Sequence, residues 1–227
     1  MTKIHGWTPT LSVSYRRQWL DRCLTTATPL MQGLVLDVGG KRINERGAFR
    51  PPQSDQWYAL NITRPEYPHV ISDAHHLPVE DACADTLICT EVLEHVADPQ
   101  QVVAELSRIL RPGGHLILSI PFLIPVHGDP FDFQRFTPHG LSRLLTMHHF
   151  EVLELQPMGL FFTTISDLIR FPLSKIPSAL LRWSVGLPFM LLATLLVRLD
   201  DQPRVRQSPL LSSYTTGYFV IARKKEL

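Results

Sequence analysis

Apolar runs of strand length alternate along the chain with stretches whose apolar residues recur at helical spacing. The clearest case is residues 85–121, where two apolar runs flank a polar loop and a helical stretch. Asp98 is a suitable N-cap and Pro99 suits the first helical position, while Arg-Pro-Gly-Gly at 111–114 ends the helix and turns the chain. The apolar face of this helix consists of Val102, Val103, Leu106, Ile109 and Leu110. The block predicts a βαβ unit of two parallel strands with a polar loop where ligands bind.

The rest of the chain continues this alternation. A short amphipathic helix is predicted at 15–24, and Thr137 is a suitable cap for another helix that begins beside it. Strands are predicted at 33–40, 57–62, 69–71, 85–89, 115–120, 151–156 and 218–222. Regular alternation of this kind is typical of an α/β fold with a doubly wound, mostly parallel sheet, here of seven strands. The regions 41–56 and 158–213 break the pattern.

Length and composition narrow the class of protein. A chain of 227 residues can bury one α/β core and one extra element. The formal net charge of +1, without a Lys/Arg-rich run, predicts no nucleic-acid partner. Cys23, Cys83 and Cys89 lack CxxC spacing, so we expect no disulfide framework and no thiolate zinc site. The N-terminal residues contain no apolar run long enough for a secretory signal, so we expect a cytoplasmic protein.

Polar or small residues follow the predicted strands at the point where each strand ends. They are Asp37, Gly39 and Gly40 at the end of the first strand, Asn61 at the end of the second, Asp73 and Ala74 just after the third, and Thr90 and Glu91 just after the fourth. Glycine lets a backbone approach a ligand closely, and an amide or carboxylate accepts a hydrogen bond from a hydroxyl. Because the carboxyl ends of parallel strands share one edge of the sheet, these residues are predicted to outline one ligand crevice.

Four ordered motifs in this region resemble those of a known family. They are LDVGG at 36–40, DAHHLP at 73–78, EVLEHV at 91–96 and LRPGGHLILSIP at 110–121. With them the chain resembles the class I S-adenosylmethionine-dependent methyltransferases of the small-molecule type 11 branch, over about 30–156 plus the last strand. The resemblance implies a Rossmann-like fold, S-adenosylmethionine as cofactor and methyl transfer to a small or lipid-linked acceptor at oxygen or carbon.

The resemblance also implies a role for each residue of the crevice. The Gly39-Gly40 loop after Asp37 would lie along the methionine end of the cofactor, and Asn61 would lie near its ribose. Asp73 and Ala74 would meet the adenine, while Thr90 and Glu91 would close over the sulfonium side.

The chain departs from the family at two positions. Lys41 stands where the family has a further glycine, and Asn61 stands where Asp or Glu is usual. The stretch 41–56 contains Gly and Pro without a helical stripe, so the family's first helix is predicted to be short or lost. Its cations, Lys41, Arg42, Arg46 and Arg50, either hold a carboxylate or phosphate or belong to a solvated loop. A second hypothesis is therefore a methyltransferase-fold binding or scaffold protein, and a third is a nucleotide-sugar or dinucleotide enzyme.

Candidates for proton transfer lie in the loop after the fifth strand. His127 is the first candidate for a base or for a group that orients the acceptor, Asp132 is the second, and Arg135 would clamp an anion. The alternative is an ion pair between Asp132 and Arg135 that fixes the loop. His127, Asp129 and Asp132 alone are too few to predict a metal, and we expect none. His95 is expected to be a packed, hydrogen-bonded histidine.

The insertion at 158–213 separates the two parts, 1–157 and 214–227, of the predicted methyltransferase domain. Residues 168–199 contain four cations and no acid, and 183–197 are uncharged, a length of about 22 Å as a helix against the roughly 30 Å of a bilayer core. Gly186 and Pro188 are expected to interrupt this helix. We predict an interfacial or re-entrant hairpin that contacts a membrane through 160–205, on the inner membrane face, or else a lid or dimer contact. Its predicted lipid-facing aromatic residues are Phe161, Phe162, Phe171, Trp183 and Phe189.

Overall fold

The computed structural model describes residues 11–41, 47–52 and 56–226, and all structural statements refer to these residues. The strands are β1 (Val35–Val38), β2 (Trp57–Asn61), β3 (Val70–Ile71), β4 (Ala84–Thr90), β5 (Leu110–Pro121), β6 (Phe150–Pro157) and β7 (Gly217–Lys224). The α-helices are α1 (Tyr15–Ala27), α2 (Pro99–Ile109), α3 (Pro138–Met147), α4 (Phe161–Ser174), α5 (Ala179–Leu196) and α6 (Pro203–Arg206). All seven predicted strands are therefore present.

The strands form one sheet in the order β3-β2-β1-β4-β5-β7-β6. β1 to β5 pair in parallel, whereas β7 runs antiparallel to both β5 and β6. The predicted seven-stranded, mostly parallel α/β sheet is confirmed. The predicted turn at 111–114 lies inside β5, as an irregularity between the pairs Ala84–Leu110 and Thr86–His115.

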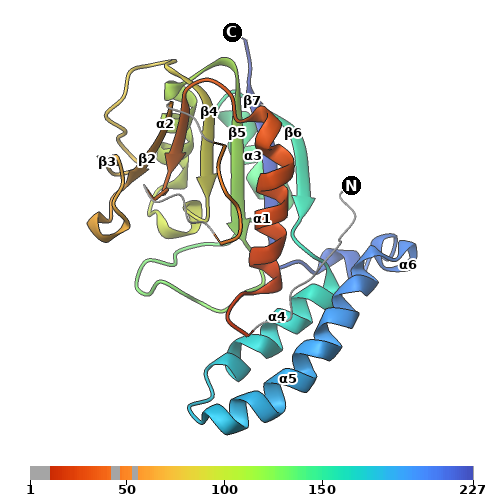
Figure 1. The fold of residues 1–227 in the computed structure, drawn as a ribbon. Helices are drawn as coiled ribbons and strands as arrows, with labels where there is room; N and C mark the ends of the chain where they lie inside the picture. Colours follow the sequence, from red (N-terminus) through yellow and green to blue (C-terminus); the bar gives the residue numbers. More distant parts are fainter. Residues whose placement is uncertain (1–10, 42–46, 53–55, 227) are drawn as a thin grey trace.

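Helices cover both faces of the sheet (Figure 1). One core lies against α2 and α3 and includes Val102, Leu106, Leu141 and Leu145. The other lies against α1, whose Tyr15, Leu20 and Leu24 pack with side chains of β1, β4, β5 and β7. No helix follows β1 among the described residues of 41–56, as predicted, so α1, which precedes the sheet in sequence, covers this face instead.

Two helices begin at the predicted caps. Asp98 accepts hydrogen bonds from the backbone N–H groups of Gln100 and Gln101, with Pro99 in the first turn. Thr137 accepts one from Gly140 N. These side chains satisfy N–H groups that have no partner within the helix, which explains why the sequence identified both boundaries correctly.

The insertion forms a helical hairpin of α4 and α5 below the carboxyl ends of β5 and β6 (Figure 1). The prediction that Gly186 and Pro188 interrupt the second helix is wrong, because both lie inside α5. Gly186 serves close packing, since a Cβ there would lie 2.7 Å from Leu11 Cδ1. The predicted length was also wrong: Ala179–Asp201 is a helical segment of 23 residues, apolar and long enough to cross a membrane by length and composition.

The hairpin is tied to the α/β core at its base. Buried Asp200 accepts hydrogen bonds from Leu160 N, Phe162 N and Thr163 N, which are the free donors at the start of α4. Ala193 of α5 and Val197, directly after it, lie in the core beneath α1. The division of the chain into a methyltransferase domain, 1–157 plus 214–227, and an insertion, 158–213, stays a prediction. The base of the hairpin contributes side chains to the core that lies against α1.

Candidate active site

The register of the sheet brings the predicted crevice residues to one edge. Val38 pairs with Leu60 of β2 and with Cys89 of β4, and Asn61 pairs with Ile71 of β3. The four strands therefore end level with one another. The predicted polar residues lie at or just beyond these strand ends, so they share one edge of the sheet; that they bind the cofactor there stays a prediction.

The loop after β1 is held by Asn61. Gly39 has φ +78°, a left-handed conformation that favours glycine, and its N–H donates to Leu60 O at 2.7 Å. Asn61 donates from Nδ2 to Gly40 O at 3.1 Å and accepts from Thr63 N at 3.0 Å. A Cβ on Gly40 would lie 2.4 Å from Asp37 Oδ2. These glycines form a tight cradle beside a buried carboxylate, a shape that fits close approach of a cofactor.

The cations of the next stretch are partly engaged within the protein. Lys41 forms an ion pair with Glu66. Arg50 donates to the carbonyl groups of Gly47 and Phe49. Arg42 and Arg46 lie outside the described residues. For Lys41 and Arg50, the structure therefore favours a structural role over the predicted rim for an anion.

Asp73 lies in an exposed turn after β3. It accepts hydrogen bonds from His75 N at 2.9 Å and from His75 Nδ1 at 2.6 Å. The backbone hydrogen bond and the imidazole hold the pKa of Asp73 below its ordinary value, despite a small opposing effect of burial. Ala74 is half-buried against the core. Asp73 is therefore an ionised acceptor at the rim of the crevice, where the resemblance expects the adenine.

Glu91 lies at a strained position after β4, with φ +57°. Its Oε1 accepts from Ser119 Oγ at 2.8 Å, and its Oε2 forms an ion pair with Arg16 of α1. Thr90, at the end of β4, is buried. Glu91 is thus held by β5 and α1. Burial lowers the pKa of Arg16 to about 10, which still leaves it protonated at neutral pH.

The loop 121–137 is fixed onto the 93–96 turn. Phe133 N donates to Glu94 O at 2.8 Å, and Gln134 Nε2 donates to the carbonyl groups of Leu93 and Val96. Arg135 donates to both oxygens of Asp132, which also accepts from His127 N at 2.9 Å. The ion pair expected as the alternative reading is present. The Arg135 guanidinium holds the pKa of Asp132 well below its ordinary value, although burial of the carboxylate acts in the opposite direction.

Glu94 and His95 complete the site around His127. The Glu94 side chain is fully buried, and Oε1 lies 3.7 Å from His95 Nε2 and 3.9 Å from His127 Nε2. Burial raises the pKa of Glu94, against smaller opposing effects of His95 and two arginines. Burial also lowers the pKa of His127, which Asp132 partly opposes. His95 is hydrogen-bonded, as expected, through Nδ1 to Phe131 O at 2.7 Å.

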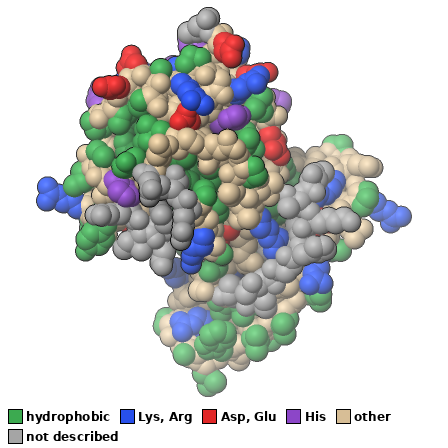
Figure 2. Space-filling model, turned by 45° about the horizontal axis from the view of Figure 1, so that its top comes forward, with side chains coloured by type: hydrophobic (Ala, Val, Ile, Leu, Met, Phe, Trp, Pro, Cys, Tyr) green, Lys and Arg blue, Asp and Glu red, His purple; other side chains and the backbone are tan. Residues whose placement is uncertain are grey.

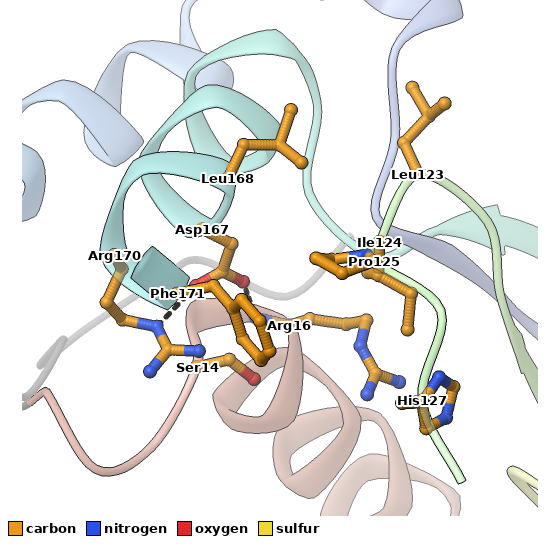
Figure 3. Close-up of a pocket in the computed structure, with 10 residues that line it drawn as sticks. All are labelled: Ser14, Arg16, Leu123, Ile124, Pro125, His127, Asp167, Leu168, Arg170 and Phe171. Atoms are coloured by element: carbon orange, nitrogen blue, oxygen red, sulfur yellow. Dashed lines mark hydrogen bonds and ion pairs between the residues drawn. The ribbon is translucent and has the colours of Figure 1, made fainter. Parts of the chain in front are cut away.

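A cavity of about 180 Å³ adjoins these groups (Figure 3). Its polar lining includes Arg16, His127 and Arg170, and its apolar lining consists of Leu123, Ile124, Pro125, Leu168 and Phe171. In Figure 3 Arg16 reaches from α1 toward His127, while Phe171 of α4 lies on the hairpin side. The cavity therefore connects the site at the sheet edge with the α4–α5 hairpin.

Sequence reasoning missed two side chains of this site. Arg16 lies in a helix that was predicted only as an element, and its role depends on contact with Glu91, 75 residues away. Glu94 lies between the apolar residues Leu93 and Val96 in a strand-end loop. A glutamate between apolar residues, just after a strand, indicates a carboxylate that is buried near the sheet edge, and this signal could have identified Glu94.

Comparison with known proteins agrees with this fold and site. A family model described as a methyltransferase domain matches residues 52–118. The chain is similar to a ubiquinone biosynthesis O-methyltransferase of Leptothrix cholodnii, with 30% identity over 92% of this chain and 84% of the relative. It is also similar to a probable S-adenosylmethionine-dependent methyltransferase of Mycolicibacterium smegmatis, with 35% identity over 39% of this chain and 38% of the relative. That match spans well under half of the relative's length.

Solved structures show the same fold. A putative sarcosine dimethylglycine methyltransferase from Galdieria sulphuraria superimposes with a TM-score of 0.57 over 93% of this chain and 85% of that one, at 15% identity. Together with the Leptothrix relative, matched over most of its length, this similarity defines the class: the chain belongs to the S-adenosylmethionine-dependent methyltransferases. The predicted family, fold class and cofactor are confirmed.

Proposed function

We propose that this protein transfers a methyl group from S-adenosylmethionine to an oxygen or carbon of a small or lipid-linked acceptor. The carrying observation is that the glycine cradle, Asn61, Asp73 and the Thr90–Glu91 step share one sheet edge, and that Arg16, which pairs with Glu91 at this edge, also lines the cavity at His127. When bound, the cofactor supplies an electrophilic methyl group. The protein supplies position and a site shielded from water, which account for much of the acceleration of such a transfer.

His127 is proposed as the base, or as the group that orients the acceptor. It lines the cavity, and burial keeps its pKa low enough for a neutral imidazole at pH 7. Asp132 and Arg135 act through it: their ion pair and the bond from His127 N fix the loop. An acceptor hydroxyl beside His127 would have a proton acceptor within reach.

An amphiphilic acceptor fits the surroundings of the cavity. Five of its lining residues are apolar, and two of these, Leu168 and Phe171, also belong to the exposed face of α4. The name of the Leptothrix relative, a ubiquinone biosynthesis O-methyltransferase, supports an oxygen acceptor in an amphiphilic molecule. We therefore favour an acceptor whose polar end reaches His127 and whose apolar part lies toward the hairpin.

A membrane surface is the proposed location of this acceptor, with the protein in the cytoplasm on the inner membrane face. The hairpin exposes Leu180 (84%), Leu181 (52%) and Trp183 (55%) near its tip, beside Lys175 and Arg182. In Figure 2 its lobe carries hydrophobic and cationic side chains. Phe171 and Trp183 are exposed as predicted, whereas Phe161, Phe162 and Phe189 are partly buried. Because Met190, Ala193 and Val197 of the helical segment are buried, the hairpin is suited to lie on a membrane.

The competing hypothesis is a methyltransferase-fold binding or scaffold protein. Two observations keep it open to test: both polar ends of the Asn61 amide are used within the protein, and Lys41 occupies a glycine position. Both observations concern the Gly39–Gly40 loop, and neither affects the predicted cofactor contacts at Asp73 and Glu91.

Binding of S-adenosylmethionine and S-adenosylhomocysteine, measured by calorimetry, separates these hypotheses. The wild-type protein should bind both, and Asp73→Ala should weaken binding about tenfold, because the loss of a charged acceptor costs roughly 1.5 kcal/mol. Glu80→Ala, which removes an exposed carboxylate seven residues further on, serves as the control. Binding of neither compound would reject the enzyme, and binding of NAD instead would favour the dinucleotide enzyme. Transfer of labelled methyl to a membrane extract then tests turnover.

Co-sedimentation with vesicles containing phosphatidylglycerol tests the membrane contact. The triple variant Leu180→Ser, Leu181→Ser, Trp183→Ser should lower the bound fraction at least about threefold, because each apolar side chain contributes roughly 1 kcal/mol or more at the interface. A matched control, Ile71→Ser, Met147→Ser, Leu153→Ser, removes three exposed apolar side chains outside the hairpin. Equal losses in the two variants, or none in either, would contradict contact through the hairpin.

A further inference from the structure

Glu94 is a buried carboxylate without a hydrogen bond. Its side chain is fully buried, and neither Oε1 nor Oε2 has a hydrogen-bond partner in the described part of the chain. A buried carboxylate in this condition is costly unless a cation or a proton compensates it. The two neighbouring guanidinium groups each have a carboxylate of their own, since Arg16 pairs with Glu91 and Arg135 with Asp132. Among the described residues, Glu94 is therefore the carboxylate of this cluster that neither arginine binds directly.

The hydrogen bond from His95 Nδ1 fixes the tautomer of the neutral ring. Nδ1 lies 2.7 Å from the carbonyl oxygen of Phe131, and because a carbonyl only accepts, Nδ1 carries a proton. In the neutral ring, Nε2 then has a lone pair, and this atom lies 3.7 Å from Glu94 Oε1. Two electron-rich atoms face one another with no proton of the neutral ring between them.

His127 approaches the same Glu94 oxygen from the other side. Its Nδ1 lies 3.3 Å from Asp132 Oδ2, so a proton on Nδ1 faces a carboxylate, and Nε2 lies 3.9 Å from the same Glu94 oxygen. The two rings meet edge to face, with centroids 4.9 Å apart. The ligand atoms of Glu94, His95 and His127 all lie within 4.8 Å of one another.

We propose that Glu94, His95 and His127 bind a divalent transition-metal cation of the zinc class. Two imidazole nitrogens and one carboxylate are a known ligand set for Zn²⁺, with a fourth position left for water or substrate. Ligand atoms about 2.1 Å from zinc lie roughly 3.4 Å apart at the tetrahedral angle. The pairs at 3.7 and 3.9 Å therefore need to close by a few tenths of an ångström, and a pair at the 4.8 Å limit would need to close by about 1.4 Å. The carbonyl of Phe131 is an outer partner of the kind that orients a metal-binding histidine, and Asp132 holds the backbone N–H of His127.

The cation would have a defined use, although its binding does not depend on methyl transfer. His127 also lines the cavity proposed for the acceptor, so the open coordination position would face that cavity. An acceptor hydroxyl bound there would lose its proton more readily. In this arrangement His127 would orient the acceptor through the cation. Of the two roles proposed for His127, this arrangement favours orientation of the acceptor over action as a base. The prediction of no metal considered only residues of one loop, because Glu94 and His95 come from another.

Metal binding to the untagged, full-length protein tests the proposal in the absence of S-adenosylmethionine. After treatment with a chelator, the protein should bind one Zn²⁺ per chain by calorimetry and by elemental analysis. Co²⁺ should give visible absorption bands of a four-coordinate site, and a large excess of Mg²⁺ should not displace Zn²⁺, because imidazole ligands disfavour Mg²⁺. Each of Glu94→Gln, His95→Gln and His127→Gln should weaken Zn²⁺ binding at least about tenfold.

His139→Gln is the matched control, because His139 is exposed at the start of α3, outside the cluster. Thermal denaturation of the metal-free variants verifies the fold, and if Glu94→Gln does not fold, His95→Gln, at a 30% exposed side chain, carries the test. Substoichiometric Zn²⁺ in the wild type, or equal loss in the control and the cluster variants, would overturn the proposal. Cofactor calorimetry and the labelled-methyl assay report separately on the proposed function, so the two proposals can fail independently.

Discussion

Replacing Gly40 by alanine is expected to weaken binding of S-adenosylmethionine at least about tenfold, equivalent to roughly 1.4 kcal/mol. A Cβ at this position would lie 2.4 Å from Asp37 Oδ2 and 2.8 Å from the backbone oxygen of Asp37. Rotation of the Asp37 side chain relieves only the first contact, so the end of β1 must move. That movement would also break the hydrogen bond from Asn61 Nδ2 to Gly40 O, which shapes the cradle. Calorimetry with S-adenosylmethionine measures the effect.

Gly140→Ala is the control for the Gly40 substitution. It also adds one methyl group to a glycine, but in the first turn of α3, where the nearest atom is Thr137 Oγ1 at 3.3 Å. Its cofactor affinity should equal that of the wild type. Circular dichroism verifies that both variants are folded. Wild-type affinity in folded Gly40→Ala would mean that the cofactor does not use the cradle after β1.

The sheet and the crevice were predictable because their signals are local. The apolar runs of β1, β4 and β5 have strand length, and Asp98 and Thr137 cap helices whose first N–H groups need acceptors. Parallel strands also share an edge, so residues that follow separate strands meet without any further information. The sequence therefore placed Asp37 and Asn61 at one sheet edge, and their role in binding the cofactor stays a prediction.

The features that failed depend on contacts between distant segments. Gly186 and Pro188 disfavour a helix locally, yet α5 continues through both because its buried face, including Gly186 and Met190, packs against the protein. Arg16 reaches Glu91 because α1 covers this face of the sheet. Glu94 acquires its neighbour His127 when the 121–137 loop is fastened to the 93–96 turn. In each case tertiary packing decided against the local pattern.

Replacing Asp167 by alanine is expected to lower the free energy of unfolding by about 3 kcal/mol, because it removes the carboxylate partner of buried Arg170 and the acceptor of one buried and one partly buried backbone N–H group. Asp167 of α4 accepts from Tyr15 N at 2.9 Å and from Arg16 N at 2.8 Å, at the start of α1. It also accepts from Arg170 Nε at 3.0 Å. For a chain of this size the loss corresponds to roughly 10 °C in the melting temperature. Denaturant and thermal unfolding measure it.

The Asp167 substitution also tests whether the hairpin positions the site. The backbone N–H of Arg16 donates to Asp167, and the guanidinium of Arg16 pairs with Glu91. The variant should therefore weaken cofactor binding as well as stability. Asp81→Ala is the matched control: it too removes a carboxylate from an arginine, Arg108, but its side chain is 78% exposed, and such pairs contribute about 0–1 kcal/mol. If the two variants are equally stable, the Asp167 contacts do not hold the hairpin to α1. If only stability falls, the hairpin supports the fold without positioning Arg16 for the cofactor.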